Sequence, residues 1–483
     1  MNPHLWHLFF NTNGEWSHLA AQHPEQLSNH WVLDLVRIVL RVLIGLFTVL
    51  LVVPPLVWWE RRLLGWMQQR QGPNRVGPFG LLQTIADGVK LLFKEDMNPL
   101  KVDTVLFVLA PIAFLIPSLV IPGVIPWGPS RVWGAVSPGN SIGVLYLLAW
   151  SSLAVYGIVM AGWSSNNKYS LLGGLRSSAQ MISYELAMGL AIIAVVLMSG
   201  TLNLQDIVDH QGYWIYNWHL LAYFPLGLIA MLIYTISMLA ETNRAPFDLP
   251  EAETELVAGY HTEYTSMKFA TFFMGEYANM VITSAINATL FWGGYHGPLP
   301  WLDGSYWGQH IAGMPGQVIE AVLSVGWFVA KTMCGLYFFI WVRATLPRLR
   351  YDMLMRFGWQ GLLPVSLFTI LLIAVSITCN APLAAGLPIT VGNLVALGGS
   401  IVLFGAMLVW FAKTKPSMKF TNNTRRSVSL HSSAVPFKGS PSDIGRGGTS
   451  TPVQSTAGSD AAFGTASSTA TITANPGDEA LKS

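Results

Sequence analysis

Residues 241–264, ETNRAPFDLPEAETELVAGYHTEY, place six carboxylates and one cation between two long apolar segments. Like charges held close together raise one another's pKa and titrate as a coupled set, so such a group can take up and release protons near neutral pH. The fold must therefore carry an acidic loop at a membrane boundary, where we expect proton chemistry. The carboxylates belong to Glu241, Asp248, Glu251, Glu253, Glu255 and Glu263, and the cation is Arg244.

The composition is that of a membrane protein. Only 11% of the 483 residues are charged and 52% are hydrophobic, whereas soluble domains have about 25% charged residues. The net charge of +2 is too small to indicate nucleic-acid binding. The only cysteines, Cys334 and Cys379, are too few to ligate an iron–sulfur cluster or a Cys-based zinc ion, and we expect them to be buried free thiols. Motifs for nucleotide binding are absent from the sequence.

An all-α fold with about nine transmembrane helices is expected, because a bilayer core needs about 20 apolar residues per helix. The qualifying segments are roughly residues 33–59, 102–122, 141–162, 181–200, 220–240, 269–291, 317–341, 361–380 and 388–411.

The distribution of cations predicts the orientation. Lysine and arginine residues concentrate in cytoplasmic loops. The odd-numbered connections between these segments carry almost all of the loop cations, and the even-numbered ones carry Arg131 alone. We therefore expect the N-terminus outside and the C-terminus in the cytoplasm.

Three regions are expected along the chain. Residues 1–31 form an outer N-terminal extension, and residues 32–411 form the transmembrane helical domain, with an acidic cytoplasmic loop at residues 241–268. From residue 412 to residue 483 the chain is rich in Ser, Thr, Gly, Ala and Pro, which is typical of a disordered tail.

The connection after the first span contains an amphipathic pattern suited to the membrane interface. Two interpretations remain open from the sequence. The helix can be a surface anchor in which Asp87 pairs with Lys90, or its apolar face can cover a passage for a lipid-soluble ligand. The apolar positions at helical spacing are Leu81, Leu82, Ile85, Val89 and Leu92.

Ionisable residues also occur within the apolar segments. Each such group is unfavourable by about 2.5–3.5 kcal/mol on insertion scales, so it normally pairs, faces a wet cavity or is neutral. We expect proton-relay roles for Glu185 and Glu276, and structural pairing for Glu320. Lys331 lies in the same expected span as Glu320.

Four long blocks of the sequence carry a resemblance to a known family. The blocks are ERRLLGWMQQRQGPNRVGPFGLLQTIADGVKLLFKED, GWSSNNKYSLLGGLRSSAQMISYEL, ETNRAPFDLPEAETELVAGYHTEY and LPRLRYDMLM. They resemble the quinone-chamber membrane subunit (the H subunit) of the proton-pumping NADH:quinone oxidoreductase, respiratory complex I. The resemblance covers roughly residues 32–380 and leaves out the N-terminal extension and the tail.

The resemblance implies a multi-pass membrane subunit that helps to form a quinone chamber. Of a bacterial plasma (inner) membrane and a mitochondrial one, we expect the bacterial membrane, on the basis of the unusual C-terminal tail. Ubiquinone or menaquinone would be the substrate. FMN and the iron–sulfur clusters would be held by partner subunits of the redox arm, and antiporter-like membrane subunits would be further partners. Neither a catalytic residue nor a metal site is implied on this chain.

The resemblance also implies roles for individual residues. The quinone passage would be shaped by Arg62, Asp87 and Lys90. Charge balance or docking of the redox arm would fall to Arg244, Arg343, Arg348 and Arg350. Proton coupling would involve Glu185, Glu241, Asp248, Glu251, Glu253, Glu255, Glu263 and Glu276.

Three other functions compete with this interpretation. The first is a membrane subunit of an energy-converting hydrogenase, which shares this ancestry. The second is an independent ion transporter, which would explain the buried acids but not the crowding of polar residues in the cytoplasmic loops. The third is a structural anchor whose acids only form docking salt bridges.

Replacing Glu255 with Gln tests the acidic loop. Glu251 and Glu255 are four residues apart, so on a helix they share a face and repel, which favours keeping one protonated. We expect Glu255→Gln to lower quinone reductase activity and proton pumping in membrane vesicles while assembly stays intact. Normal pumping in this variant would remove Glu255 from the mechanism.

Overall fold

A computed structural model describes residues 31–129, 141–248, 258–311 and 313–383, together with residues 398, 399, 402 and 405. The chain divides into two units, Met1–Lys415 and Pro416–Ser483, and every described residue lies in the first. The regular structure of the described residues is entirely helical, which confirms the all-α prediction. The expected tail and the N-terminal extension lie outside the described residues, except for Trp31.

Five segments of the described part are long and apolar enough to cross a membrane. They are Thr104–Gly123, Gly143–Ser164, Lys168–Ser199, Met314–Thr345 and Tyr351–Thr378. The protein is therefore a polytopic membrane protein, as expected. Two further helices occupy the first and sixth expected spans, and most of the ninth expected span lies outside the described residues.

The long helices are α4 (Trp31–Met67), α6 (Thr104–Val120), α8 (Gly143–Ser164), α9 (Lys168–Ser199), α12 (Leu226–Glu241), α14 (Ser266–Phe291), α16 (Met314–Thr345) and α18 (Leu363–Leu383). The short α-helices are α5 (Gln83–Phe93), α10 (Leu204–Gln211), α11 (His219–Ala222), α15 (Gly304–His310) and α17 (Tyr351–Arg356). Single turns of other helix types are η1 (Pro78–Gly80), η2 (Ile121–Gly123), η3 (Ile215–Asn217), η4 (Gly259–His261), η5 (Pro300–Leu302) and η6 (Phe357–Leu362).

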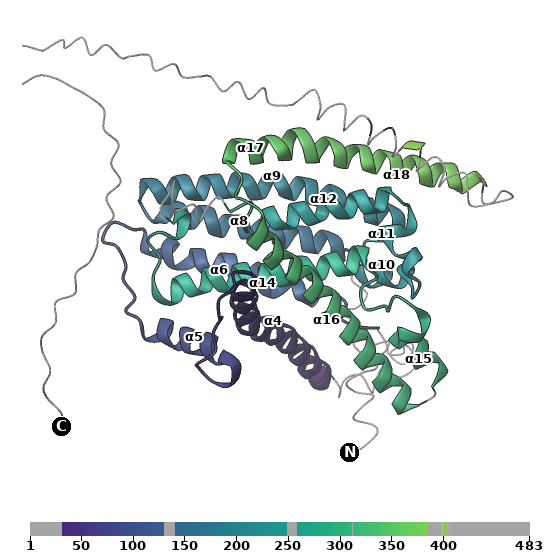
Figure 1. Ribbon diagram of the computed structural model, residues 1–483, viewed down its shortest axis with the longest axis horizontal. Coiled ribbons are helices and arrows are strands. Elements are labelled where there is room, and N and C mark those ends of the chain that lie inside the picture. Colours follow the sequence, from purple (N-terminus) through teal and green to yellow (C-terminus); the bar gives the residue numbers. More distant parts are fainter. Residues whose placement is uncertain are drawn as a thin grey trace, which may run out of the picture. The chain divides into compact units, whose positions relative to one another are not determined.

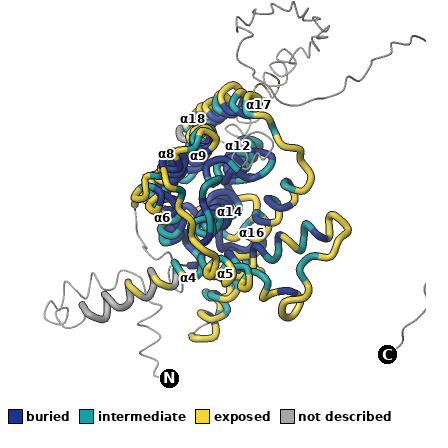
Figure 2. Tube along the Cα trace, turned by 90° about the vertical axis from the view of Figure 1, so that its left-hand side faces the viewer, coloured by how far each residue is buried: buried dark blue, intermediate teal, exposed yellow. Residues whose placement is uncertain are grey.

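The helices pack as a bundle around α14. Helix α9 packs against α8, α12 and α18, while α14 packs against α6, α12 and α16 (Figure 1). Almost every residue of α14 from Gly275 onward is buried, and Figure 2 shows this helix in the interior of the bundle, with exposed residues at the periphery. A helix that is apolar all round, as α14 largely is, is suited to such a position.

The fifth expected span is interrupted. Instead of one helix over residues 220–240, the chain forms the short helix α11 and then α12. Pro225 immediately precedes α12, and it has no backbone N–H with which to continue a helix from α11.

The odd-numbered connections meet at one end of the bundle. Lys268 pairs with Asp96 at 2.8 Å, which joins the fifth connection to the first. The side chain of Asn167 donates to Glu263 at 2.6 Å and so joins the third connection to the fifth. The N–H of Leu349, from the seventh connection, donates to the fifth at 3.0 Å. The cation-rich connections therefore lie together at this end of the bundle.

The even-numbered connections meet at the other end, where α10, α11 and α15 lie (Figure 1). There the N–H of Val144 donates to the carbonyl of Leu202 at 3.0 Å, and the N–H of Gly293 donates to Gln211 at 2.9 Å. This separation is what the distribution of cations predicts, and the side of the membrane on which each end lies stays a prediction.

Two details of the surface bear on the expectations. The apolar positions of the amphipathic segment that contains α5 are all exposed in this chain, from Val89 at 45% to Leu92 at 61%. Cys334 is a free thiol, as expected, but it is exposed on α16 instead of buried. Its side chain lies on the outer surface of an apolar helix, where lipid or another subunit can cover it.

Replacing Gly173 with Ala tests the packing of α9. An added methyl group would lie 2.6 Å from the Cα of Gly259, so the backbones would have to separate. We expect a loss of about 1–3 kcal/mol in the free energy of unfolding, measured on the purified chain in detergent. The control is Gly189→Ala in the same helix, where a methyl group meets open space and should be neutral or slightly stabilising. Equal losses of unfolding free energy in the two variants would contradict the close approach of Gly173 to Gly259.

Candidate functional site

Five side chains from four parts of the chain form an ion cluster in the interior. Glu60 comes from α4, Arg244 follows α12, Glu276 and Tyr277 lie on α14, and Arg343 lies on α16. The two carboxylates, Arg244 and Tyr277 are each at most 7% exposed, whereas Arg343 is partly exposed. The cluster thus brings together two acids and two guanidinium groups that are far apart in the sequence.

Glu60 is the most densely contacted carboxylate of this cluster. Its Oε2 accepts a hydrogen bond of 2.6 Å from the hydroxyl of Tyr277. Its Oε1 accepts a hydrogen bond from Arg343 Nη1 and lies 3.9 Å from Arg244 Nη1. A buried carboxylate is strongly destabilising unless it is paired and hydrogen-bonded, and both conditions are met here.

Arg244 links the second acid to the first. Its Nη2 lies 3.9 Å from Glu276 Oε2, and its guanidinium carbon lies 4.3 Å from the centre of the Tyr277 ring. Tyr260 donates a hydrogen bond of 2.9 Å to the other oxygen of Glu276. Since both acids interact with Arg244, a change in the charge of one acid alters the electrostatic environment of the other.

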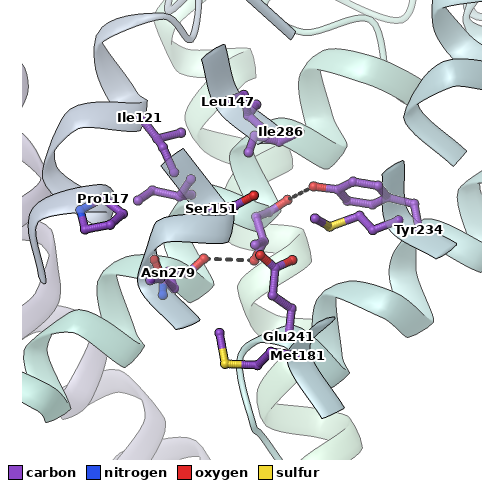
Figure 3. A pocket seen from close by; sticks show the side chains of 13 residues that line it. Pro117, Ile121, Leu147, Ser151, Met181, Tyr234, Glu241, Asn279 and Ile286 are labelled. Atoms are coloured by element: carbon purple, nitrogen blue, oxygen red, sulfur yellow. Dashed lines mark hydrogen bonds between the residues drawn. The ribbon is translucent and has the colours of Figure 1, made fainter. Parts of the chain in front are cut away.

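A small cavity of about 20 Å³ lies among α6, α8, α9, α12 and α14, and its mainly apolar lining includes a few polar side chains. Figure 3 shows the carboxylate of Glu241 directed into it, between Asn279 and Tyr234. Glu241 Oε2 is buried and has no hydrogen-bond partner among the described residues. Tyr234 donates to the carbonyl of Thr283 at 3.2 Å, and Thr283 Oγ1 donates to the carbonyl of Asn279 at 2.9 Å.

Glu185 lies beside this cavity. Its carboxylate accepts a hydrogen bond from Ser152 and one of 3.4 Å from Ser151, which also lines the cavity. Ser151 thus connects Glu185 to the cavity into which Glu241 is directed. The structure therefore brings these two predicted residues together, with hydroxyl groups next to both.

The three residues predicted for the quinone passage lie where α4 meets α5. Asp87 pairs with Arg61 at 2.5 Å and with Lys90 at 3.7 Å. Partial burial acts to raise the pKa of Asp87, but the hydrogen bond and charge of Arg61 outweigh it and hold that pKa below its ordinary value. The pair between Asp87 and Lys90 was expected, whereas the closer pair with Arg61 was not.

Arg62 lies against three aromatic rings. Its guanidinium carbon is 5.3 Å from the ring centre of Trp58, 5.4 Å from that of Trp66 and 5.6 Å from that of Phe79. It also donates a hydrogen bond of 3.4 Å to the carbonyl of Phe79. Cation–π contacts of this kind hold a guanidinium group at an apolar surface without a carboxylate partner.

The other predicted residues are dispersed. Arg348 and Arg350 are exposed, and Arg350 pairs with Asp352 at 3.5 Å, so the structure does not bring them to the ion cluster. Asp248 is partly buried at the edge of the described part, and Glu263 accepts a hydrogen bond from Asn167. Three predicted acids, Glu251, Glu253 and Glu255, lie outside the described residues.

Two more ionisable groups lie toward the opposite end of α16. Glu320 is 6% exposed and lies against α15, where a methyl group on Gly308 would collide with its carboxylate. Lys331 donates to the carbonyls of Gly294 and His296 at 2.9 and 2.6 Å, and also to that of Trp292. Lys331 thus ties α16 to the turn that follows α14.

The sequence analysis did not identify Glu60, Tyr277 or Tyr260 as site residues. Glu60 ends an apolar run, LLVVPPLVWWE, and directly follows the first expected span, residues 33–59, although α4 continues to Met67. The one signal for Glu60 is that it is a carboxylate inside a helix that continues past the end of the apolar run. The two tyrosines carried no signal, because phenols are common in apolar segments.

Comparisons with known proteins give a consistent result. A family model described as NADH dehydrogenase matches residues 40–374. The H subunit of NADH-quinone oxidoreductase from Rickettsia rickettsii (strain Iowa) is 50% identical over 351 residues, which cover 72% of this chain and 96% of the relative. The proteins of the same description from Rickettsia bellii (strain RML369-C) and Rickettsia typhi (strain ATCC VR-144 / Wilmington) are 51% and 50% identical, with the same coverage.

Replacing Arg343 with Met tests the ion cluster. Removing one partner of a buried ion pair leaves the other charge uncompensated. We expect a loss of about 3 kcal/mol in the free energy of unfolding in detergent, at the low end of the range for buried pairs because Arg343 is partly exposed. The control is Arg350→Met, which breaks an exposed pair and should change that free energy by about 0–1 kcal/mol. A loss for Arg343→Met no larger than for the control would contradict the pairing with Glu60.

Proposed function

The chain belongs to the family of the H subunit of NADH-quinone oxidoreductase, a membrane component of respiratory complex I, and we propose that it helps to form the quinone chamber and couples quinone reduction to proton translocation. The ion cluster carries this proposal. It holds acids and cations in contact in the protein interior, between the cation-rich end of the bundle and the cavity beside Glu241.

The chemistry of the quinone requires such a group. Reduction of a quinone to a quinol consumes protons and changes the charge nearby. In a poorly polarisable interior, charges act on one another far more strongly than in water. Glu60 and Glu276 share Arg244 at 3.9 Å, so a change of charge at one end of the cluster alters the proton affinity of the acids at the other.

The quinone passage is proposed between α4 and α5, which are in contact. Arg62, Asp87 and Lys90 lie at this junction, and the exposed apolar residues of α5 offer a surface for an isoprenoid chain. The same face would also suit an interfacial anchor. The quinone headgroup would be reduced beyond this chain, next to a cluster held by a partner subunit.

The proton route is proposed to run from the ion cluster to Glu241 and Glu185. Glu276 belongs to the cluster, and Glu241 and Glu185 lie at the cavity. The acids at residues 248–263 would extend this route toward the quinone. Arg244 and Arg343 neutralise the cluster, while the exposed Arg348 and Arg350 suit docking of the redox arm.

The partners follow from the same proposal. FMN and iron–sulfur clusters would be held by other subunits, since two cysteines are too few to ligate such a cluster on this chain. Antiporter-like membrane subunits would receive the coupled charge, and ubiquinone or menaquinone would be the substrate. A bacterial plasma membrane is the proposed location, because the relatives above come from bacteria.

Replacing Glu60 with Gln in the assembled complex tests the function. The tagged chain would be purified from native membranes in mild detergent, its partners identified by mass spectrometry, and the complex reconstituted in vesicles. We expect wild-type chain to bring down flavin- and cluster-bearing subunits with NADH:quinone reductase activity. For Glu60→Gln we expect a complex of normal composition. Its reductase activity and pumping should fall at least about tenfold, which corresponds to about 1.4 kcal/mol in activation free energy.

The control is Glu95→Gln, which removes an exposed carboxylate from the first connection and should change neither rate. Unchanged reductase activity and pumping in Glu60→Gln would refute the coupling role of the cluster. Recovery of a nickel–iron hydrogenase module in place of flavin-bearing subunits would move the electron donor to hydrogen, and recovery of the chain alone would favour a transporter.

A further inference from the structure

The segment that carries Arg244 is a buried reversal of the chain at residues 242–247. Thr242, Asn243, Arg244 and Phe247 are each between 3% and 6% exposed. Asn243 has a φ of +50°, in the left-handed region. The N–H groups of Thr242, Asn243 and Arg244 donate to carbonyls of the last turns of α12. Buried carbonyl groups of this segment also need donors, and these come from other parts of the protein.

Gln180 of α9 supplies partners at both ends of the reversal. Its side chain is fully buried, at 0% exposed. Its amide nitrogen donates to the carbonyl of Ala240 at 2.8 Å and to that of Phe247 at 2.7 Å. One amide group thus joins the last turn of α12 to the end of the reversal, and Arg244 lies between the two carbonyls.

Two neighbours of Gln180 on α9 contact the same segment. Ser177 donates to Asn243 Oδ1 at 3.3 Å, and the Tyr184 ring packs on Phe247 with ring centres 5.6 Å apart. Residues 177, 180 and 184 are spaced by three and four positions, so they share one face of the helix. A single face of α9 therefore contacts the reversal from one end to the other.

The reversal is also tied to the connection after α16. The N–H of Leu349 donates to the carbonyl of Pro246 at 3.0 Å, and Tyr184 donates to the carbonyl of Leu354 at 2.9 Å. That connection begins just after Arg343, the second cation next to Glu60. Gln180 and this connection thus support the same segment, the one that carries Arg244.

We propose that Gln180 is a positioning residue for proton coupling, because its amide sets the distance of Arg244 from Glu60 and Glu276. This inference rests on the proposed function of the ion cluster. Both ion pairs of Arg244 measure 3.9 Å, longer than a direct hydrogen bond, so a small displacement of the reversal changes both. Gln180 itself need not contact quinone to exert this effect.

Replacing Gln180 with Met tests this role in the purified, vesicle-reconstituted complex. Methionine keeps the volume of the side chain but cannot donate to either carbonyl. We expect at least about a fivefold fall in pumping per assembled complex. We also expect a shifted pH profile of NADH:quinone reductase activity, since the acids of the cluster would lose part of their pairing with Arg244.

Replacing Gln180 with Glu provides a graded rescue. A buried carboxyl group favours its neutral form, which has one O–H donor and can restore one of the two hydrogen bonds. Pumping of this variant should fall between those of wild type and Gln180→Met. It should also improve toward acidic pH, where the introduced carboxyl group is protonated.

Gln211 offers a matched control at the other end of the bundle. It is also 0% exposed, and its amide nitrogen donates to the carbonyls of Thr289 and Ile207 at 2.9 and 3.3 Å. Gln211→Met therefore removes a fully buried amide without touching the Arg244 segment. It should lower the yield of assembled complex while leaving the pH profile and the pumping per complex unchanged.

The outcomes separate this inference from the function on which it rests. If Gln180→Met behaves like Gln211→Met, Gln180 is only structural and the inference fails. If Glu60→Gln is inactive while Gln180→Met keeps the wild-type pH profile and pumping, the coupling role stands and the positioning role fails. If Glu60→Gln pumps normally, the coupling role fails for the whole cluster.

Discussion

The buried carboxylate of Glu60 is the constraint on which the arrangement of this protein's centre depends. A carboxylate at 2% exposure is tolerated only when opposite charge and hydrogen-bond donors surround it. Its partners come from α14, α16 and the reversal after α12, so these parts must converge on α4. The apolar surfaces of the helices favour a bundle, but they would permit several positions of α4 relative to the other helices. The ion pairs of Glu60 stabilise one of these positions.

The same pairing is the basis of the coupling role proposed for the ion cluster. The ion cluster contains two acids and two guanidinium groups, so its formal charge is balanced when both acids are ionised. A balanced cluster is stable at rest, yet each member depends on the charge of its neighbours. Glu241, with a buried oxygen that has no protein partner among the described residues, lines the cavity and is the proposed next site for a proton.

Irregular backbone in the interior also helps to position the charged groups of the ion cluster. The reversal at residues 242–247 interrupts the helices to present Arg244, and its polar groups are satisfied by Gln180, by Ser177 and by the connection after α16. Such a segment can hold a cation where no helix surface would place it. It also makes the position of that cation dependent on hydrogen bonds from other helices, which is the basis of the role inferred for Gln180.

The sequence by itself determined the membrane class, the helical fold and the grouping of cation-rich connections, because apolar length and cation distribution are local properties of the chain. It also singled out Arg244, from the acidic loop, and Glu276, from its place in an apolar segment, and the family resemblance added Arg343. Only the tertiary structure revealed that Glu60, Tyr277 and Tyr260 join them, and that Gln180 supports Arg244. These contacts connect residues up to 283 positions apart. Pairing over such distances depends on how helices pack, which local patterns of polarity do not encode.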